Sequence, residues 1–171
     1  LPRTLTVVGA GVIGLEYASI FAALGVRVTI IDKRRRLLPF IDAEIVDSLT
    51  YHFNQQRAIL RLGEEVHSIE PITDEHGDRV KIHLVSGKQI ITEMALYSIG
   101  RTGATRSLNI ETVGLQTDER GLLKVNAQYQ TNIPNIYAVG DVIGFPSLAS
   151  TSMEQGRLAA CHAFGVPTQS S

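Results

Sequence analysis

The sequence predicts an α/β fold, a doubly wound parallel sheet that carries an inserted three-stranded antiparallel meander. Three observations lead to this prediction. Strand-like apolar runs alternate with helical patterns in the first third of the chain, a glycine-rich turn joins the first strand to the first helix, and the apolar spacing later changes to strict alternation. Alternating strands and helices are typical of a parallel sheet, because parallel strands are usually joined by a helical crossover.

The first elements form a βαβαβ unit. The run from Leu5 to Val8 is apolar and β-branched and stops at glycines, which is typical of a buried strand. A helical repeat of apolar residues then ends at Gly25, and a second strand covers residues 26–31. Asp42 is placed to cap a second helix, and residues 58–62 make a short third strand. This order is the nucleotide-binding half of a doubly wound sheet.

The next elements form the meander and then return to the parallel sheet. Three short alternating strands are expected at 66–72, 79–85 and 89–92, separated by turns at 76–78 and 86–88. A parallel strand returns at 94–99, and we expect residues 5–100 to fold as one complete unit. Further elements are expected closer to the C-terminus: a hairpin near 118–121, a buried strand at 136–139, and a last helix from about 148 to 164.

Composition excludes several classes of partner. The chain has 171 residues, 44% hydrophobic and 19% charged, which is enough for a hydrophobic core. Sixteen basic and seventeen acidic residues leave a net charge of -1, so we expect neither nucleic acid nor a membrane as partner. The single cysteine, Cys161, excludes an internal disulfide, and the five histidines have no ligand spacing, so no metal site is expected.

The strongest motif is GxGxxG, formed by Gly9-Ala10-Gly11-Val12-Ile13-Gly14. It follows a strand and opens a helix, which is the context of a Rossmann-like dinucleotide site. Gly9 permits the tight turn, Gly11 lets backbone N–H groups approach a pyrophosphate, and Gly14 allows close packing of helix on strand. The helix N-terminus adds its positive dipole end. The alternative is a glycine-rich turn that holds no ligand.

Acidic and basic residues follow the second strand together. Asp32 closes the strand eighteen residues after Gly14, where a carboxylate can bind both hydroxyls of an adenosine ribose, which favours NAD(H). Lys33, Arg34 and Arg35 come next, and arginine is suited to a 2′-phosphate, which favours NADP(H). A solvated basic loop is the alternative. The combination predicts a site that accepts both nucleotides.

Three more residues are candidates at the carboxyl edge of the sheet. Glu16 lies one helical step beyond the phosphate turn and can accept a hydrogen bond from a nicotinamide carboxamide, or it is a surface residue. Gly100 lets the backbone pass close to a dinucleotide after the returning strand. Arg101 either braces an interface or second cofactor or caps the strand end.

Three stretches resemble the flavoprotein disulfide-reductase family. They are GAGVIGLEYASIF (Gly9 to Phe21), GRTG (Gly100 to Gly103) and TNIPNIYAVGDVIG (Thr131 to Gly144), which matches the second flavin-binding motif of that family. The similarity covers about residues 3–165. Two further stretches, RLLPFIDAEIVDSLTYHF and GFPSLAS, are similar to members that transfer hydride between NADPH and NAD⁺ through bound FAD.

The resemblance implies a role for each matching residue. The motif glycines, with Val12 and Ile13, would hold the pyrophosphate of NAD(H) or NADP(H), Glu16 would face the nicotinamide, and Gly100 would line its site. Gly140 and Asp141 would hold the flavin, with Asp141 on the ribityl hydroxyls. Leu148 and Ala149 would place their backbone beside the flavin ring. No catalytic side chain is expected, because hydride transfer between cofactors needs no acid or base.

The resemblance also implies a domain order in a cytoplasmic homo-oligomer. Residues 1–127 would be the NAD(P)-binding domain, and residues 128–171 would return to a flavin domain whose N-terminal part lies outside this chain. We expect residues 129–164 to associate with a second chain or to dock on their own domain. The isolated chain is expected to bind nucleotide without flavin and without hydride transfer. A disulfide reductase of the lipoamide dehydrogenase type and a non-catalytic NAD(P)-binding module are the alternatives.

Overall fold

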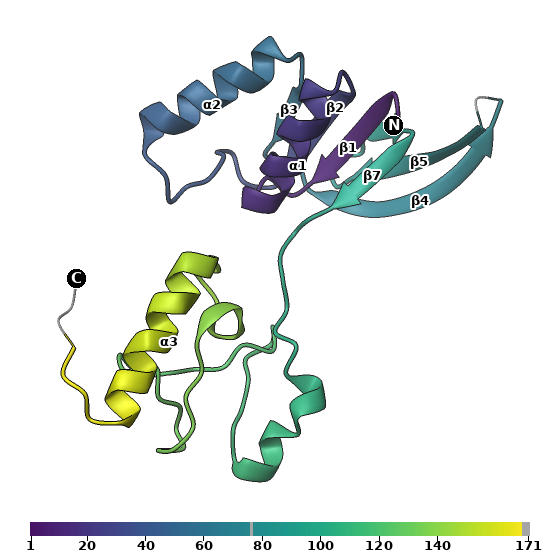
Figure 1. Cartoon of the computed structure of the whole chain (residues 1–171). Coiled ribbons are helices and arrows are strands. Elements are labelled where there is room, and N and C mark those ends of the chain that lie inside the picture. Colours follow the sequence, from purple (N-terminus) through teal and green to yellow (C-terminus); the bar gives the residue numbers. More distant parts are fainter. Residues whose placement is uncertain (76, 169–171) are drawn as a thin grey trace. The chain divides into compact units, whose positions relative to one another are not determined.

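The computed structural model describes residues 1–75 and 77–168, and the chain divides into two compact units, Leu1–Gly100 and Arg101–Ser171 (Figure 1). His76, expected in a turn, and residues 169–171 of the expected C-terminal segment lie outside the described residues. The predicted boundary after residue 127 refers to the domains of a longer protein and stays a prediction.

The first unit is built on a parallel sheet of four strands in the order β3-β2-β1-β7 (Figure 1). Its elements are β1 (Thr4–Val8), α1 (Val12–Ala23), β2 (Arg27–Asp32), α2 (Ala43–Gln55), β3 (Ile59–Leu62) and β7 (Met94–Tyr97). In the register of the sheet Val8 lies beside Ile31 and Tyr97, and Asp32 lies beside Leu62. The carboxyl ends of the strands therefore form one edge.

Helices pack on one face of this sheet and the meander packs on the other. Alternate strand residues such as Val7 and Ile30 pack with Leu15, Ala18 and Phe53 of the helices, all of them buried. The helix α2 begins where expected, because the Asp42 side chain accepts a hydrogen bond from the N–H of Glu44 at 2.9 Å. The intervening strand residues face the opposite way, as the period of two requires.

The meander is a separate antiparallel sheet with the order β4-β5-β6. Its strands are β4 (Val66–Asp74), β5 (Gly77–Leu84) and β6 (Gln89–Thr92). Ile82 and Leu84 of β5 pack against Val8 and Ile31, so the meander covers the second face of the parallel sheet. The predicted fold class is confirmed.

The second unit has little regular structure apart from the helix α3 (Ala149–Ala163). The described residues of this unit also form three short 3₁₀ turns, Arg106–Leu108, Ile110–Val113 and Gly140–Ile143. Its small hydrophobic core consists of Ile110, Leu115, Leu123 and Ala138. The expected hairpin is a tight turn in which Thr117 bridges to Leu123 and the Asp118 carboxylate accepts two backbone N–H groups.

The strand expected at 136–139 does not form, and this prediction is wrong. Within the described residues this segment makes a single antiparallel bridge, from Tyr137 to Gln130, and no strand. A strand requires a neighbouring segment that pairs with successive N–H and C=O groups. Here the pairing is limited to the two hydrogen bonds of that bridge, from the Thr131 N–H to the Ile136 carbonyl and from the Ala138 N–H to the Tyr129 carbonyl. The apolar pattern therefore indicates burial, of Ala138 in particular, with backbone pairing limited to a single bridge.

Candidate dinucleotide site

The glycine-rich turn stands where β1 ends and α1 begins. Gly9 has φ +103°, and its N–H donates to the Ile31 carbonyl at 2.8 Å, which holds the turn against β2. A Cβ at Gly9 would lie 2.5 Å from the Ser98 carbonyl oxygen, and one at Gly14 would lie 1.9 Å from the Gly9 carbonyl oxygen. Both positions therefore require glycine for the chain's own packing.

Gly11 is different from the other two motif glycines. Its backbone is extended, with φ -79° and ψ -179°, and an added Cβ would meet no protein atom within 4 Å. The open space adjoins the N-terminus of α1, which has no side-chain cap, while Val12 and Ile13 are exposed there. The first N–H groups of a helix have no intrahelical acceptors, so an anion in this space finds donors and the positive end of the helix dipole.

Asp32 ends β2 directly beside this turn and is only 7% exposed. Its Oδ2 accepts from the Ala10 N–H and from Nη2 of Arg34, each at 2.7 Å, and its Oδ1 accepts from N–H and Nε of Arg34, each at 2.8 Å. The guanidinium thus contacts both carboxylate oxygens in the bidentate geometry that suits arginine.

The charge of Asp32 is stabilised by these contacts. Burial by itself would raise the pKa of the carboxyl, but the hydrogen bonds from the Arg34 guanidinium and from the N–H groups of Arg34 and Ala10 outweigh it and lower the pKa to about 2. The side-chain hydrogen bonds and the charge of Asp32 in turn raise the pKa of the Arg34 guanidinium. Asp32 is therefore a carboxylate at any physiological pH, neutralised by its neighbour.

The basic loop that follows is anchored at its ends and exposed between them. Leu37 is buried in the core, and the carbonyls of Asp32 and Arg34 accept from the N–H groups of Glu64 and Gly63, each at 3.1 Å. The side chains between these anchors, Lys33, Arg34, Arg35 and Arg36, are exposed. The loop therefore presents its cations to solvent at the carboxyl edge of the sheet.

The other candidates of the first unit lie at the same edge or on α1. Glu16 is exposed on α1. Gly100 has φ +141°, and an added Cβ there would meet nothing within 4 Å. Sequence reasoning missed Ser98, whose Oγ donates to the Val8 and Gly9 carbonyls at 3.0 and 3.1 Å and so fixes the glycine turn on β7. The signal in the sequence was a small hydroxyl residue near the end of the predicted returning strand.

Two of the candidates of the second unit contact each other. Arg101 and Asp141 form an ion pair in which both side chains are more than half exposed. Gly140 has φ +76°, and its N–H donates to the buried Gln155 Oε1 at 2.7 Å. Leu148 is the N-cap residue of α3 and Ala149 its first residue, both exposed. Gln155 is a further residue that sequence reasoning missed.

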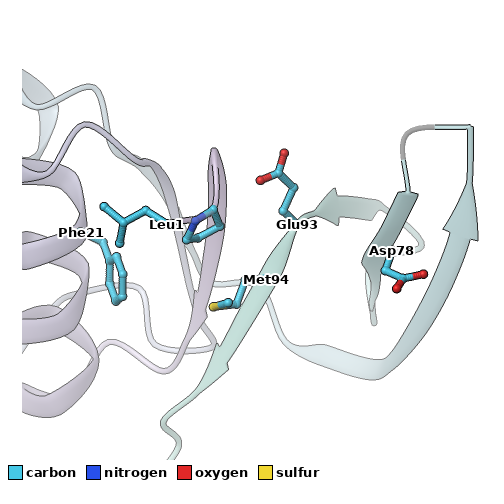
Figure 2. A pocket seen from close by; sticks show the side chains of 6 residues that line it. Leu1, Phe21, Asp78, Glu93 and Met94 are labelled. Atoms are coloured by element: carbon cyan, nitrogen blue, oxygen red, sulfur yellow. The ribbon is translucent and has the colours of Figure 1, made fainter.

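A hollow of about 520 Å³ lies at the opposite edge of the first unit, where β1 and β7 begin (Figure 2). Its lining residues are Leu1, Pro2, Phe21, Asp78, Glu93 and Met94. None of them belongs to the glycine turn or the basic loop. In the part of the chain that the structure describes, no His, Cys, Asp and Glu residues gather in threes to hold a metal, and no helix is long and apolar enough to span a membrane.

Comparison with known proteins gives one family. The family model described as pyridine nucleotide-disulphide oxidoreductase matches residues 1–156. A curated protein of Mycobacterium bovis (strain BCG), named soluble pyridine nucleotide transhydrogenase, is 51% identical over 168 residues, which cover 98% of this chain and 35% of that protein. A protein of the same name from Serratia proteamaculans is 55% identical over 159 residues, 93% of this chain and 33% of its own length.

Solved structures agree with this result. LpdA from Mycobacterium tuberculosis has a TM-score of 0.87 and 32% identity, covering 100% of this chain and 36% of that chain. The HOCl-induced flavoprotein disulfide reductase RclA from Escherichia coli has a TM-score of 0.85 and 32% identity, covering 99% and 38%. The chain thus spans about a third of the length of the relatives that it matches.

Proposed function

The chain belongs to the pyridine nucleotide-disulphide oxidoreductase family, and from that premise we propose that it is the pyridine nucleotide-binding part of an FAD-dependent transhydrogenase. The reaction is NADPH + NAD⁺ → NADP⁺ + NADH, in which one hydride moves and no proton is released or taken up. The names of the relatives at 51–55% identity support this reaction. Residues 1–127 are proposed as the NAD(P)-binding domain and 128–171 as the segment that contributes to the flavin domain.

The observation that carries the proposal is the glycine turn. Gly9 and Gly14 are fixed by close backbone contacts, whereas the space beside Gly11 at the N-terminus of α1 is open. A pyrophosphate fits such a cradle, because it needs close backbone approach and unpaired N–H donors. The Asp32–Arg34 pair stands at the end of the adjacent strand, where the adenosine ribose belongs in this fold.

The proposed mechanism assigns binding and orientation to the chain. The N–H groups at the start of α1 bind the pyrophosphate, Asp32 or the loop cations bind the adenosine ribose or its 2′-phosphate, and Glu16 accepts from the nicotinamide carboxamide. Gly100 leaves space for the nicotinamide beside β7. FAD, when bound, would supply a group that can both accept and donate a hydride.

The second unit carries the residues proposed to hold the flavin. Asp141 is proposed to accept hydrogen bonds from the ribityl hydroxyls. Its carboxylate is paired with Arg101 in this structure, so it either leaves Arg101 or binds the guanidinium and the hydroxyls together. The backbone of Leu148 and Ala149, at the start of α3, is proposed to lie beside the flavin ring, with the Leu148 N–H already donating to the Pro146 carbonyl at 2.8 Å. The complete enzyme is proposed to be a cytoplasmic homo-oligomer, which gel filtration and cell fractionation of the full-length protein test.

A disulfide reductase is the second candidate, because RclA carries that description at 32% identity. Such a reaction needs two redox cysteines, and this chain supplies only Cys161. The full-length enzyme separates the two candidates. Reduction of a thionicotinamide analogue of NAD⁺ by NADPH supports the transhydrogenase, whereas NADH-dependent reduction of a disulfide substrate to its dithiol, without that activity, supports the reductase.

Two glycine substitutions, one in the proposed site and one outside it, test nucleotide binding directly. Gly11→Val places a side chain in the open cradle and is expected to abolish NADH and NADPH binding without unfolding the chain. Gly156→Val is the matched control, because a Cβ at Gly156 in α3 also meets nothing within 4 Å. Titration calorimetry of the 171-residue chain measures the Kd of NADH and of NADPH for each variant. Unchanged affinity in Gly11→Val would place the nucleotide elsewhere.

A further inference from the structure

The Asp32 carboxylate has its acceptor positions filled by the chain itself. Two carboxylate oxygens offer about four lone-pair sites, and Asp32 receives four N–H groups, three of them from Arg34. Two of these come from the backbone and two from the guanidinium. A ribose hydroxyl can therefore donate to Asp32 only when one or both guanidinium bonds are released.

The Arg34 guanidinium, by contrast, keeps donors to offer. Two of its five N–H groups point at Asp32 in the contacts of the described residues, and the side chain is 42% exposed. The loop backbone that carries it is tied to Gly63 and Glu64. A phosphate can thus bind the outer N–H groups while the inner ones remain on Asp32, which holds the guanidinium plane in place.

We propose that Arg34 determines nucleotide specificity by competing with the substrate for Asp32. NADP(H) binds with the Asp32–Arg34 pair closed, its 2′-phosphate on the outer face of the guanidinium. NAD(H) binds after the pair opens, its ribose hydroxyls taking the acceptor positions that the guanidinium leaves. This inference rests on the proposed function, since it concerns how the same site selects between its two substrates.

The sign of one substitution distinguishes this competition from two independent binding residues. NADH carries a negatively charged pyrophosphate, so removal of a nearby cation weakens its binding by Coulomb's law. If Arg34 competes for Asp32, its removal has the opposite effect and NADH binds more tightly. Tighter binding of an anion after loss of a cation has no simple electrostatic explanation other than a released carboxylate.

The experiment measures the Kd of NADH and NADPH for the full 171-residue chain by nicotinamide fluorescence, which the absence of tryptophan simplifies. For Arg34→Gln we expect the NADH Kd to fall roughly fivefold and the NADPH Kd to rise roughly tenfold, the range of one or two charged hydrogen bonds. Arg27→Gln is the charge-matched control at the far end of β2, and it is expected to tighten neither nucleotide.

Two further variants guard against an effect on folding. Arg34→Lys keeps the charge but cannot contact both carboxylate oxygens, and it should lower the NADH Kd by a smaller factor. In an Asp32→Asn background, Arg34→Gln should no longer tighten NADH. An NADH Kd that is unchanged or raised in both Arg34 variants, or tightening that persists without Asp32, overturns the inference. A wild-type chain that binds neither nucleotide overturns the proposed function instead.

Discussion

The two units hold their acidic site residues in different ways. In the first, the Asp32 side chain is 6% exposed and accepts four hydrogen bonds, one from Ala10 in the glycine turn and three from Arg34 in the basic loop. In the second, Asp141 is 51% exposed and meets Arg101, which is itself 61% exposed. A buried carboxylate must be fully hydrogen-bonded, whereas an exposed pair is stabilised largely by water. The carboxylate of the proposed nucleotide site is therefore held by buried hydrogen bonds, and that of the proposed flavin site by one exposed ion pair.

The largest difference in stability between the two units is expected when one glycine of each is replaced by alanine. Gly14→Ala is expected to lower the free energy of unfolding by about 3 kcal/mol, since its Cβ would overlap a backbone oxygen of the turn. Gly140→Ala should cost about 1 kcal/mol, mainly through its positive φ, because the Cβ would meet the rotatable Ser152 side chain at 3.1 Å. Urea unfolding followed by circular dichroism measures both. Equal losses in the free energy of unfolding for the two variants would contradict the expected difference between the two units.

Substitution of the carboxylate should also destabilise the first unit more than the second. Asp32→Asn removes a buried acceptor of charged hydrogen bonds, and we expect a loss of about 2 kcal/mol in the free energy of unfolding. Asp141→Asn breaks an exposed pair, and we expect less than about 0.5 kcal/mol. The same urea experiment serves here. A larger loss at Asp141 would show that the second unit depends on its ion pair more than its exposure indicates.

The pH dependence of stability sharpens the assignment for Asp32. The folded pKa of about 2 lies below the ordinary value of 3.8, so the carboxylate stabilises the fold above about pH 4 and loses this effect as the pH falls toward 2. The free-energy difference between wild type and Asp32→Asn should therefore shrink by about 1–2 kcal/mol over that interval. A difference that stays constant from pH 5 to pH 2 would be inconsistent with a depressed pKa.

The smallest effect is expected at Arg101. Arg101→Gln should change the free energy of unfolding by a few tenths of a kcal/mol, and 0.5 M salt should remove even that, because exposed charges are screened. The Asp32–Arg34 coupling, in which the carboxylate is buried, should change less when a double-mutant cycle measures it at the same two salt concentrations. Equal salt sensitivity of the two pairs would remove the distinction between them.

Local sequence signals were sufficient for most of the fold. The strands β1 and β2, the helix α1 and the cap at Asp42 were predicted, because each depends on a short pattern of apolar, glycine or capping residues. The meander was predicted from its alternation and turn residues. The strand expected at 136–139 was wrong, since apolar character indicates burial but does not reveal whether a pairing segment lies alongside.

The sequence was sufficient to predict which residues form the candidate site, but not which contacts they make. The sequence places Asp32 and Arg34 together, but two residues of separation do not reveal whether a guanidinium turns outward to a phosphate or inward to the carboxylate. Ser98 and Gln155 were missed for a related reason. Each acts on a backbone group that is distant in sequence, Ser98 on Gly9 and Gln155 on Gly140, and only the folded chain brings these groups together.

A map of backbone amide shifts on nucleotide addition tests the central claim most directly. The ¹⁵N-labelled chain of 171 residues is titrated with NADPH and then with NADH. We expect the largest shifts at residues 9–14, at 32–35 and near Gly100, because these amides form the glycine turn, the basic loop and the adjoining end of β7. Shifts centred instead on Leu1, Phe21 and Met94, at the hollow on the opposite edge, or no saturable shifts at all, would contradict the assignment of the dinucleotide site.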